Sequence, residues 1–366
     1  MVLASLDSRE VFQSLYFVIE ENMTSFLCKD TLIIINTNDI PLIYVYAVVP
    51  VAPFEPELVI TKSIECLKEL KCDNFTLEVY YVIDTFPGDN RKLQGTLPNN
   101  FKMIWRNTNR GHRAGAINDI LKEIKNPDYV ALLDVDHRPA KDYIIKCVAA
   151  LEENDAAVSS GCFHFVANKT NILTKVIAVE HTFMDDLYQF LSHFEGFMTI
   201  QGIGVIKGSF LKDERFNEEA SLDDVDLATR MYLKGKVAVL ADTTMGDQAP
   251  TTLRDLYHQR VRWYRGILES FSNYVTLMLK APIPFSRKLS WLLIVIVPFF
   301  VYLAAPFGIL YIGDIKKLSN GPLEFAELFV GFVGYMWLMT AFGIVAILKH
   351  STLKQFEWKP SVRTDT

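Results

Sequence analysis

Two long apolar runs near the C-terminus constrain this chain of 366 residues more than any other feature. Residues 291–312 and 328–348 form runs of 22 and 21 residues without a charged side chain. At a rise of about 1.5 Å per residue, either run as a helix can cross a hydrocarbon core about 30 Å thick. The alternative is a pair of buried core helices, but uncharged runs of this length are rare in soluble folds. The sequence therefore predicts two transmembrane helices within residues 288–350.

The charges that flank these runs predict how the helical hairpin is oriented. Arg287 and Lys288 precede the first run, and Lys349 follows the second. Positive residues on both outer flanks favour a hairpin with both ends in the cytoplasm, although two lysines in the loop between the runs oppose this. We therefore expect a multi-pass protein of the cell membrane, with a cytoplasmic tail at residues 351–366.

The chain before the apolar runs has the pattern of an α/β domain over residues 41–250. Strands are expected at residues 42–49, 77–83, 102–105 and 129–133, and helices at residues 57–70 and 113–124. Alternating strands and helices predict a largely parallel sheet. In such sheets ligands bind beyond the carboxyl ends of the strands. Asp84 and Asp134 each follow a predicted strand and are therefore candidate site residues.

The regions on either side of this domain give weaker signals. Residues 251–287 mix arginines with aromatic and aliphatic side chains, which predicts amphipathic helices at a membrane interface. An ordinary pair of surface helices is the alternative. Residues 1–40 carry no motif and are treated as an N-terminal extension.

Composition excludes several classes of protein. The net charge of −6 shows no electrostatic footprint for binding nucleic acid, so no nucleic-acid partner is expected. The five cysteines are scattered and form no CxxC pair. Their arrangement argues against a disulfide framework or a zinc knuckle and fits a reducing compartment.

The first candidate motif is Asp134-Val135-Asp136. Carboxylates two residues apart on an extended segment point to the same face. Such hard oxygen ligands suit Mg²⁺ or Mn²⁺ held jointly by the protein and a diphosphate. An Asp-x-Asp sequence on its own is more often a solvated loop, but its place after an apolar strand favours a metal site.

The second motif is the acidic segment that begins at Leu222-Asp223-Asp224. Its structural interpretation is a helix start, with Ser221 as the N-cap and acids in the first turn facing the helix dipole. Its functional interpretation makes one of the two aspartates a general base. Both interpretations can hold together, because an acid at a helix start can project into a cleft.

The third motif places Gln259, Arg262 and Trp263 at i, i+3 and i+4, on one helix face. The arginine suits a diphosphate leaving group, and the indole suits the apolar face of a sugar ring. The alternative is an interfacial helix with an aromatic anchor. A fourth segment, residues 110–118, combines cations and small residues at a predicted helix start, where backbone N–H groups favour anions.

In this order, Asp84 and the segments GHRAGAIN, DVD, LDDVDLATR and QRVRW resemble the D, D, D, QxxRW pattern of glycosyltransferase family 2. The pattern is most similar to enzymes of the cellulose synthase, hyaluronan synthase and ceramide glucosyltransferase types. The match covers roughly residues 41–270, and residues 201–211 resemble the acceptor-side loop of that family. The resemblance implies a Rossmann-like GT-A fold and an inverting single displacement on a nucleotide sugar, with a UDP-sugar the expected donor.

The resemblance also implies roles for individual residues on the donor side. Asp84 would contact the nucleoside, and Arg113 would stand near the nucleotide where the family usually has lysine. Asp134 would lie by the ribose and the metal, and Asp136 would ligate Mg²⁺ or Mn²⁺. Gln259 and Arg262 would bind the diphosphate.

On the acceptor side, the family's Thr-Glu-Asp base corresponds to Leu222-Asp223-Asp224. Asp224 would be the base, with Asp223 beside it as the second candidate. Trp263 would bind the acceptor sugar, and Gly202 would belong to the acceptor-side loop.

The sequence departs from the family pattern in three places. The loop after the first strand lacks the usual asparagine, and Thr85 stands where the family often has an acid. The processive synthases have transmembrane helices before the catalytic domain, whereas the two predicted here follow it.

The sequence leaves the acceptor open. QxxRW favours a growing polysaccharide, whereas two spans favour a lipid acceptor unless subunits assemble into a homo-oligomer. The alternative to an enzyme is a catalytically silent subunit that binds nucleotide sugar or scaffolds a synthase, against which the intact acids argue. A nucleotidyltransferase would need a glycine-rich signature after the first strand, and none is present.

Overall fold

The computed structural model describes residues 43–72, 75–91, 97–199, 204–301 and 311–352. All of these residues belong to one compact unit that begins at Leu42. The predictions for the extension at residues 1–40, for Gly202 and for the tail from residue 353 concern parts of the chain outside the described residues.

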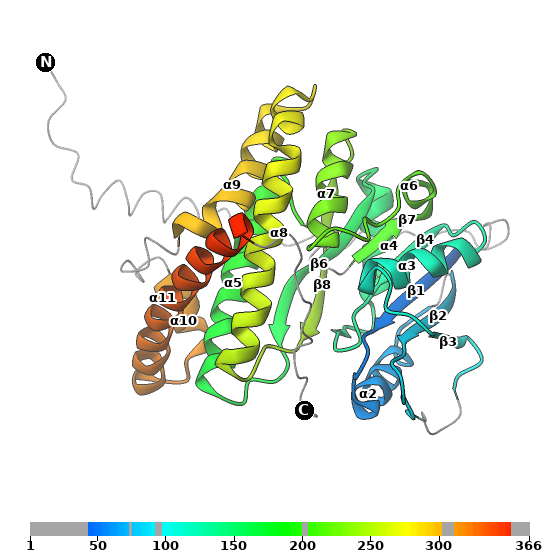
Figure 1. Ribbon diagram of the computed structural model, residues 1–366, viewed down its shortest axis with the longest axis horizontal. Helices are drawn as coiled ribbons and strands as arrows, with labels where there is room; N and C mark the ends of the chain where they lie inside the picture. Colours follow the sequence, from blue (N-terminus) through cyan, green and yellow to red (C-terminus); the bar gives the residue numbers. More distant parts are fainter. Residues whose placement is uncertain (1–42, 73–74, 92–96, 200–203, 302–310, 353–366) are drawn as a thin grey trace, which may run out of the picture. The chain divides into compact units, whose positions relative to one another are not determined.

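The described strands form one sheet of mixed direction (Figure 1). Its strand order is β3 (Phe101–Arg106), β2 (Phe75–Asp84), β1 (Ile43–Val51), β4 (Tyr129–Leu132), β7 (Gly204–Lys207), β6 (Val158–Val166), β8 (Ala238–Asp247) and β5 (Arg138–Pro139). The first four strands are parallel, as predicted. β7 runs antiparallel to β4 and β6, β8 runs parallel to β6, and β5 runs antiparallel to β8. Four of the seven described pairings are therefore parallel.

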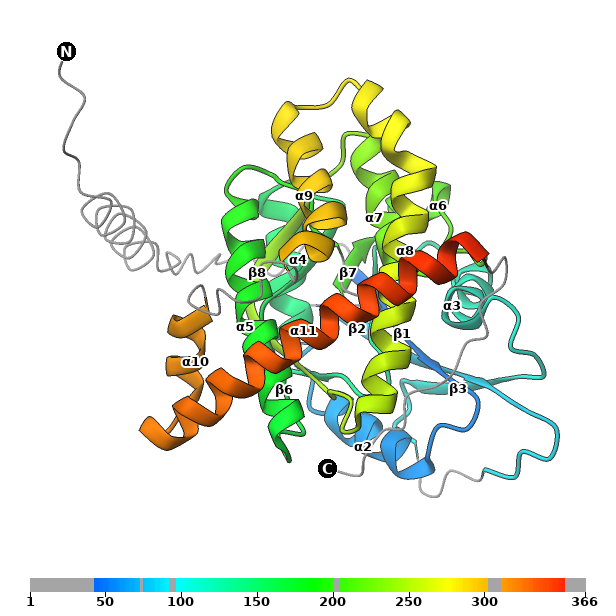
Figure 2. The same cartoon turned by 60° about the vertical axis from the view of Figure 1, so that its left-hand side comes forward.

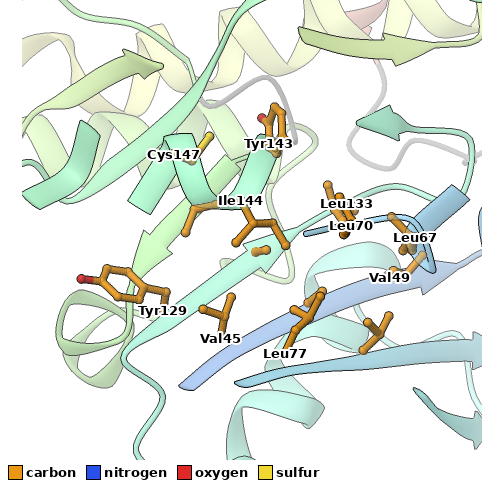
Figure 3. Packing of buried hydrophobic residues seen from close by; sticks show 14 of the residues in the cluster. Val45, Val49, Leu67, Leu70, Leu77, Tyr129, Leu133, Tyr143, Ile144 and Cys147 are labelled. Carbon is orange, nitrogen blue, oxygen red and sulfur yellow. The ribbon is translucent and has the colours of Figure 1, made fainter. Parts of the chain in front are cut away.

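Helices cover both faces of the sheet. On one face lie α2 (Glu57–Leu67) and α4 (Tyr143–Glu153), whose apolar side chains pack on β1 and β2. Figure 3 shows this layer, in which Ile144 faces Val45 and Leu77. On the other face lie α3 (His112–Glu123) and α7 (Asp223–Leu233). Because both faces are covered, β1 reads as a nearly continuous apolar run rather than an alternating one.

One longer helix packs against β6 and β8. α5 (Ile172–Ser192) packs against β6, and its N-terminus is closed by a capping box between Asn171 and Thr174. The short α6 (Gly208–Asp213) follows β7.

Most of the region predicted to hold interfacial helices, residues 251–287, is one continuous helix, α8 (Leu253–Lys280), of 28 residues. Thr252 caps it by accepting a hydrogen bond from the backbone N–H of Asp255. α8 is amphipathic, and its buried face, which includes Leu256 and Tyr264, packs against α7, α9 and α11. The amphipathic character agrees with the prediction, and the interfacial location stays a prediction. The helix is continuous from its cap to Ala281.

The last helices are α9 (Phe285–Val301), α10 (Ile312–Leu318) and α11 (Pro322–Thr352). α9 begins against the core of the α/β domain, since Trp291 is fully buried and its Nε1 donates to Thr229 of α7. Figure 2 shows α11 running diagonally across α5 and α8, and it contacts both helices.

Within the described residues, α11 is the one helix long and apolar enough to cross a membrane, over residues 322–350. Residues 302–310 of the other predicted span lie outside the description, so the hairpin is not shown. α11 packs one face against the protein, whereas Val330, Trp337 and Ile344 on its opposite face are about half exposed or more. The helix is thus apolar on both faces, unlike an ordinary surface helix.

Candidate active site

A cavity of about 700 Å³ lies at the carboxyl ends of β2 and β4. Five residues that the sequence singled out line it: Asp84, Arg113, Asp134, Asp223 and Arg262. They come from β2, α3, the β4 end, α7 and α8, so the fold gathers residues that are far apart in the chain. The position agrees with the rule that ligands bind beyond the carboxyl ends of parallel strands.

The start of α3 brings Arg113 into the cavity. The preceding Gly111 has φ of 64°, a left-handed conformation that favours glycine. A Cβ atom at Gly111 would also lie 2.7 Å from a side-chain oxygen of Glu218. Glycine at this position therefore allows both the turn and the close approach of the cavity wall.

Arg113 bridges two carboxylates that line the cavity and come from different elements. Its Nε donates to Asp134 Oδ1 at 2.8 Å, and its Nη1 donates to Asp223 Oδ2 at 2.6 Å. Burial opposes the positive charge, but Asp134 and Asp223 outweigh it and raise the pKa of Arg113. The bridge joins the DVD segment to the LDD segment in one ionic network.

Arg262 of α8 enters the same network from another side. Its Nη1 lies 3.4 Å from the backbone oxygen of Ser221, to which it donates. Burial lowers the pKa of Arg262, and Asp223 and Asp224 act in the opposite direction. The cavity therefore brings Arg113 and Arg262 beside Asp134 and Asp223, and Arg265 is a third arginine among its lining residues. Such a mixture of cations and carboxylates suits an anionic ligand with a bound cation.

Asp223 and Asp224 begin α7, as predicted. The N-cap is Leu222 rather than Ser221, and its side chain makes no capping hydrogen bond, so the predicted cap was wrong by one residue. Asp224 Oδ1 instead accepts a hydrogen bond from the backbone N–H of Val225 at 2.9 Å. Burial and the neighbouring Asp223 carboxylate raise the pKa of Asp224 to about 6. A carboxylate with that pKa is suited to take a proton near neutral pH.

Asp134 and Asp136 form a group with His137 in which one ligand atom of each residue lies within 4.8 Å of the others. Asp136 is 7% exposed, so its carboxylate is largely shielded from water. Two carboxylates this close fit a hard divalent cation such as Mg²⁺ or Mn²⁺. The donor set therefore fits the expected metal.

His137 was not predicted from the sequence. Its Nδ1 accepts a hydrogen bond from the backbone N–H of Asp134 at 2.6 Å, so the neutral ring carries its proton on Nε2. Nε2 lies 4.0 Å from Asp134 Oδ2, which is too far for a hydrogen bond, and in that tautomer it has no lone pair for a metal. His137 thus orients the loop that carries the carboxylates, and its place directly after DVD was the available signal.

Asp84 ends β2 and lines the cavity, but it is already paired. Arg106 at the end of β3 donates from Nη1 to Asp84 Oδ1 at 2.6 Å, and both side chains are buried. Burial raises the pKa of Asp84 to about 6, while Arg106 acts to lower it. The nucleoside contact inferred for Asp84 stays a prediction, and the pairing with Arg106 was not foreseen.

The three residues of the QxxRW motif take different positions. Arg262 lines the cavity, whereas Gln259 and Trp263 are not among its lining residues. Gln259 Oε1 is buried, and none of the described residues donates a hydrogen bond to it. The Trp263 ring lies over the guanidinium of Arg260, with the Arg260 Cζ atom 4.1 Å from the ring centroid.

The end of α11 reaches the cavity, which the sequence did not predict. His350 is one of the lining residues, and the neighbouring Lys349 donates from Nζ to the Tyr257 hydroxyl of α8 at 3.0 Å. From the sequence, these residues were interpreted only as the basic flank of the second apolar run. The structure gives the same segment a second role as a wall of the cavity.

Comparison with known proteins agrees with this geometry. Residues 129–348 match the model of the family described as glycosyl transferase family group 2. The chain is 27% identical over 237 residues to probable glucomannan 4-beta-mannosyltransferase 3 of Oryza sativa subsp. japonica, covering 60% of this chain and 43% of the relative. It is 26% identical over 243 residues to beta-monoglucosyldiacylglycerol synthase of Nostoc sp., covering 63% of this chain and 50% of the relative. The chain thus spans half or less of the length of these two relatives.

Among solved structures, the mannosyltransferase PcManGT from Pyrobaculum calidifontis, in complex with GDP-Man and Mn²⁺, aligns with a TM-score of 0.60. The alignment covers 93% of this chain and 95% of that one at 15% sequence identity. This likeness confirms the predicted GT-A-like fold. The family match covers more than half of the chain and includes the DVD, LDD and QxxRW segments, and the chain therefore belongs to glycosyl transferase family group 2.

Proposed function

We propose that this protein is a metal-dependent, inverting glycosyltransferase that moves a sugar from a nucleotide-sugar donor to a hydroxyl of a glycan or lipid acceptor at a membrane. The observation that carries the proposal is the Arg113 bridge between Asp134 and Asp223. It places a candidate metal ligand and the neighbour of a candidate base within reach of one cation, in one cavity. The departing diphosphate needs a metal ion held by carboxylates, and the attacking hydroxyl needs a base. Both groups must therefore lie close to the same sugar.

On the donor side, Asp134 and Asp136 would hold Mg²⁺ or Mn²⁺, which when bound neutralises charge on the departing diphosphate. Arg262 lies in the same cavity, and its fixed cation stabilises the same charge without reorganising. Arg113 holds Asp134 in place by the 2.8 Å hydrogen bond. The bound nucleotide of PcManGT is GDP-mannose, so both GDP-sugars and the expected UDP-sugars are candidate donors.

On the acceptor side, Asp224 takes the proton of the acceptor hydroxyl as its oxygen attacks the anomeric carbon. The bond from that carbon to the diphosphate breaks in the same displacement, so the configuration at the anomeric carbon inverts. Trp263 supplies an apolar platform that holds the sugar in line.

The two curated relatives carry names that mention a glucomannan and a diacylglycerol, so a polysaccharide and a membrane lipid are both candidate acceptors. α11 supports a membrane location, because its outer face is apolar and its end forms part of the cavity. We propose that this face contacts lipid and that the catalytic domain lies in the cytoplasm. The hairpin with residues 291–312, and assembly into homo-oligomers, stay predictions.

The test is release of nucleoside diphosphate by purified full-length protein from a panel of GDP- and UDP-sugars with Mn²⁺. Mannotetraose and diacylglycerol in mixed micelles are the acceptors, and products are identified by mass. Activity should require the metal and increase with one of the two acceptors. Tight donor binding without turnover of any donor would instead identify a catalytically silent subunit.

A further inference from the structure

A chain of buried polar contacts joins three helices beside the cavity. Arg260 of α8 donates from Nη2 to Glu180 Oε2 of α5. The hydroxyl of Tyr335 on α11 donates to the same oxygen at 2.7 Å. All three residues are buried, and Tyr335 is 2% exposed. α11 is therefore tied to α8 by a specific polar link as well as by apolar packing.

Because Arg260, Glu180 and Tyr335 are buried, the position of each side chain depends on the other two. A charge removed from water is costly unless it is paired and hydrogen-bonded, so Arg260 must stay close to Glu180. Tyr335 donates to the same carboxylate oxygen that the guanidinium contacts. Loss of the Tyr335 hydroxyl leaves that oxygen with fewer donors and allows the ion pair to shift.

The ion pair in turn supports the aromatic side chain of the QxxRW motif. The guanidinium of Arg260 lies under the Trp263 ring, 4.1 Å from its centroid. A cation at that distance is attracted to the ring face, which fixes the tilt of the indole. Arg260 is three residues before Trp263 on the same helix, so the stack lies along one helix face.

We propose that Tyr335 is a positioning residue which, through Glu180 and Arg260, sets the orientation of the Trp263 indole for the acceptor. The apolar helix α11 thereby influences how efficiently the sugar is transferred to its acceptor rather than to water. The proposal rests on the proposed function, because it assigns Trp263 to the acceptor.

The test compares Tyr335→Phe with Tyr81→Phe. Each variant removes one buried tyrosine hydroxyl, but Tyr81 lies in β2 and bonds to Ser63 in a separate part of the core. Transfer from the active donor to mannotetraose or diacylglycerol is measured beside hydrolysis of that donor by water. Tyr335→Phe should lower the ratio of transfer to hydrolysis by about three- to tenfold and leave the KM for the donor unchanged. Tyr81→Phe should leave the ratio unchanged.

A double-mutant cycle with Trp263→Ala shows whether the effect passes through the indole. Tyr335→Phe should change the ratio little when Trp263 is already absent. An equal loss in both backgrounds, or no loss in the wild-type background, would overturn the proposal.

A spectroscopic readout separates this proposal from the proposed function. The emission of Trp263 is obtained as the difference between the wild-type protein and Trp263→Phe. Tyr335→Phe should alter that emission, because the Arg260 guanidinium shifts relative to the indole ring, and Tyr81→Phe should not. Absence of turnover by the wild type would refute the proposed function, whereas unchanged emission in Tyr335→Phe would refute the contact chain itself.

Discussion

Replacing Arg113 with methionine should move the pH dependence of the reaction, because Arg113 is the cation that bridges the two sides of the cavity. The base must be deprotonated to act, so activity falls as the pH drops through the pKa of Asp224. Burial and Asp223 raise that pKa to about 6, and Arg113 restrains the increase. Without Arg113 the carboxylate should hold its proton to a higher pH.

The size of the shift follows from the geometry. An opposite charge within about 4–6 Å lowers the pKa of a carboxyl group by about 1–3 units. Arg113 bonds to Asp223, the residue next to Asp224, and Arg262 remains in the cavity to compensate, so the lower end of that range applies. One unit corresponds to about 1.4 kcal/mol. The acid limb should therefore move from about 6 to about 7, and the variant should lose about fivefold more activity at pH 6 than at pH 8.

The measurement is kcat/KM for release of nucleoside diphosphate between pH 5 and 9, which reports the protonation of the free enzyme. Arg110→Met is the matched control, since Arg110 precedes the same helix but pairs with Asp119 and Glu218 at a half-exposed position. The control should keep its acid limb at about 6. If Arg113→Met also keeps it there, Arg113 does not tune the base.

Four further outcomes are expected. Asp136→Ala should abolish metal-dependent activity while the circular dichroism spectrum stays that of the folded protein, and full activity in excess chelator would contradict the metal assignment. Asp224→Asn should bind donor without turnover, whereas the same behaviour in Asp223→Asn alone would move the base by one residue. Trp263→Ala should lose about a hundredfold in transfer, measured in detergent beside donor hydrolysis, which should persist. Cys66 should resist impermeant thiol reagents applied to intact cells, because a cytoplasmic domain is shielded by the membrane.

The parallel half of the sheet was predictable because its signals are local. The runs that became β1 and β4 are nearly continuous apolar segments, as are residues 79–83 of β2. Asp84 and Asp134 stand at or just beyond the ends of their strands. The antiparallel placement of β7 was not predictable, since its pairing with β4 joins residues about 75 positions apart in the chain. Strand register over such distances depends on packing that no short pattern encodes.

The same difference between local and distant signals holds at the site. The spacing within DVD and the acids of the LDD helix start were visible in the sequence. The Arg113–Asp223 contact spans 110 residues, and the Arg260–Glu180 contact spans 80. No role was predicted for Arg260, because the QxxRW motif does not include its position. A buried arginine at that position nevertheless needs an acidic partner, which is Glu180.

Finally, the contribution of α11 to the cavity bears on how the protein is handled in the laboratory. A chain shortened before Pro322 to improve solubility would lose His350 from the cavity wall and Tyr335 from the buried ion pair. Low activity in such a truncated protein would then say little about the chemistry of the intact one. Because His350 at the end of α11 lines the cavity, the detergent chosen for this helix is an experimental variable in any kinetic comparison.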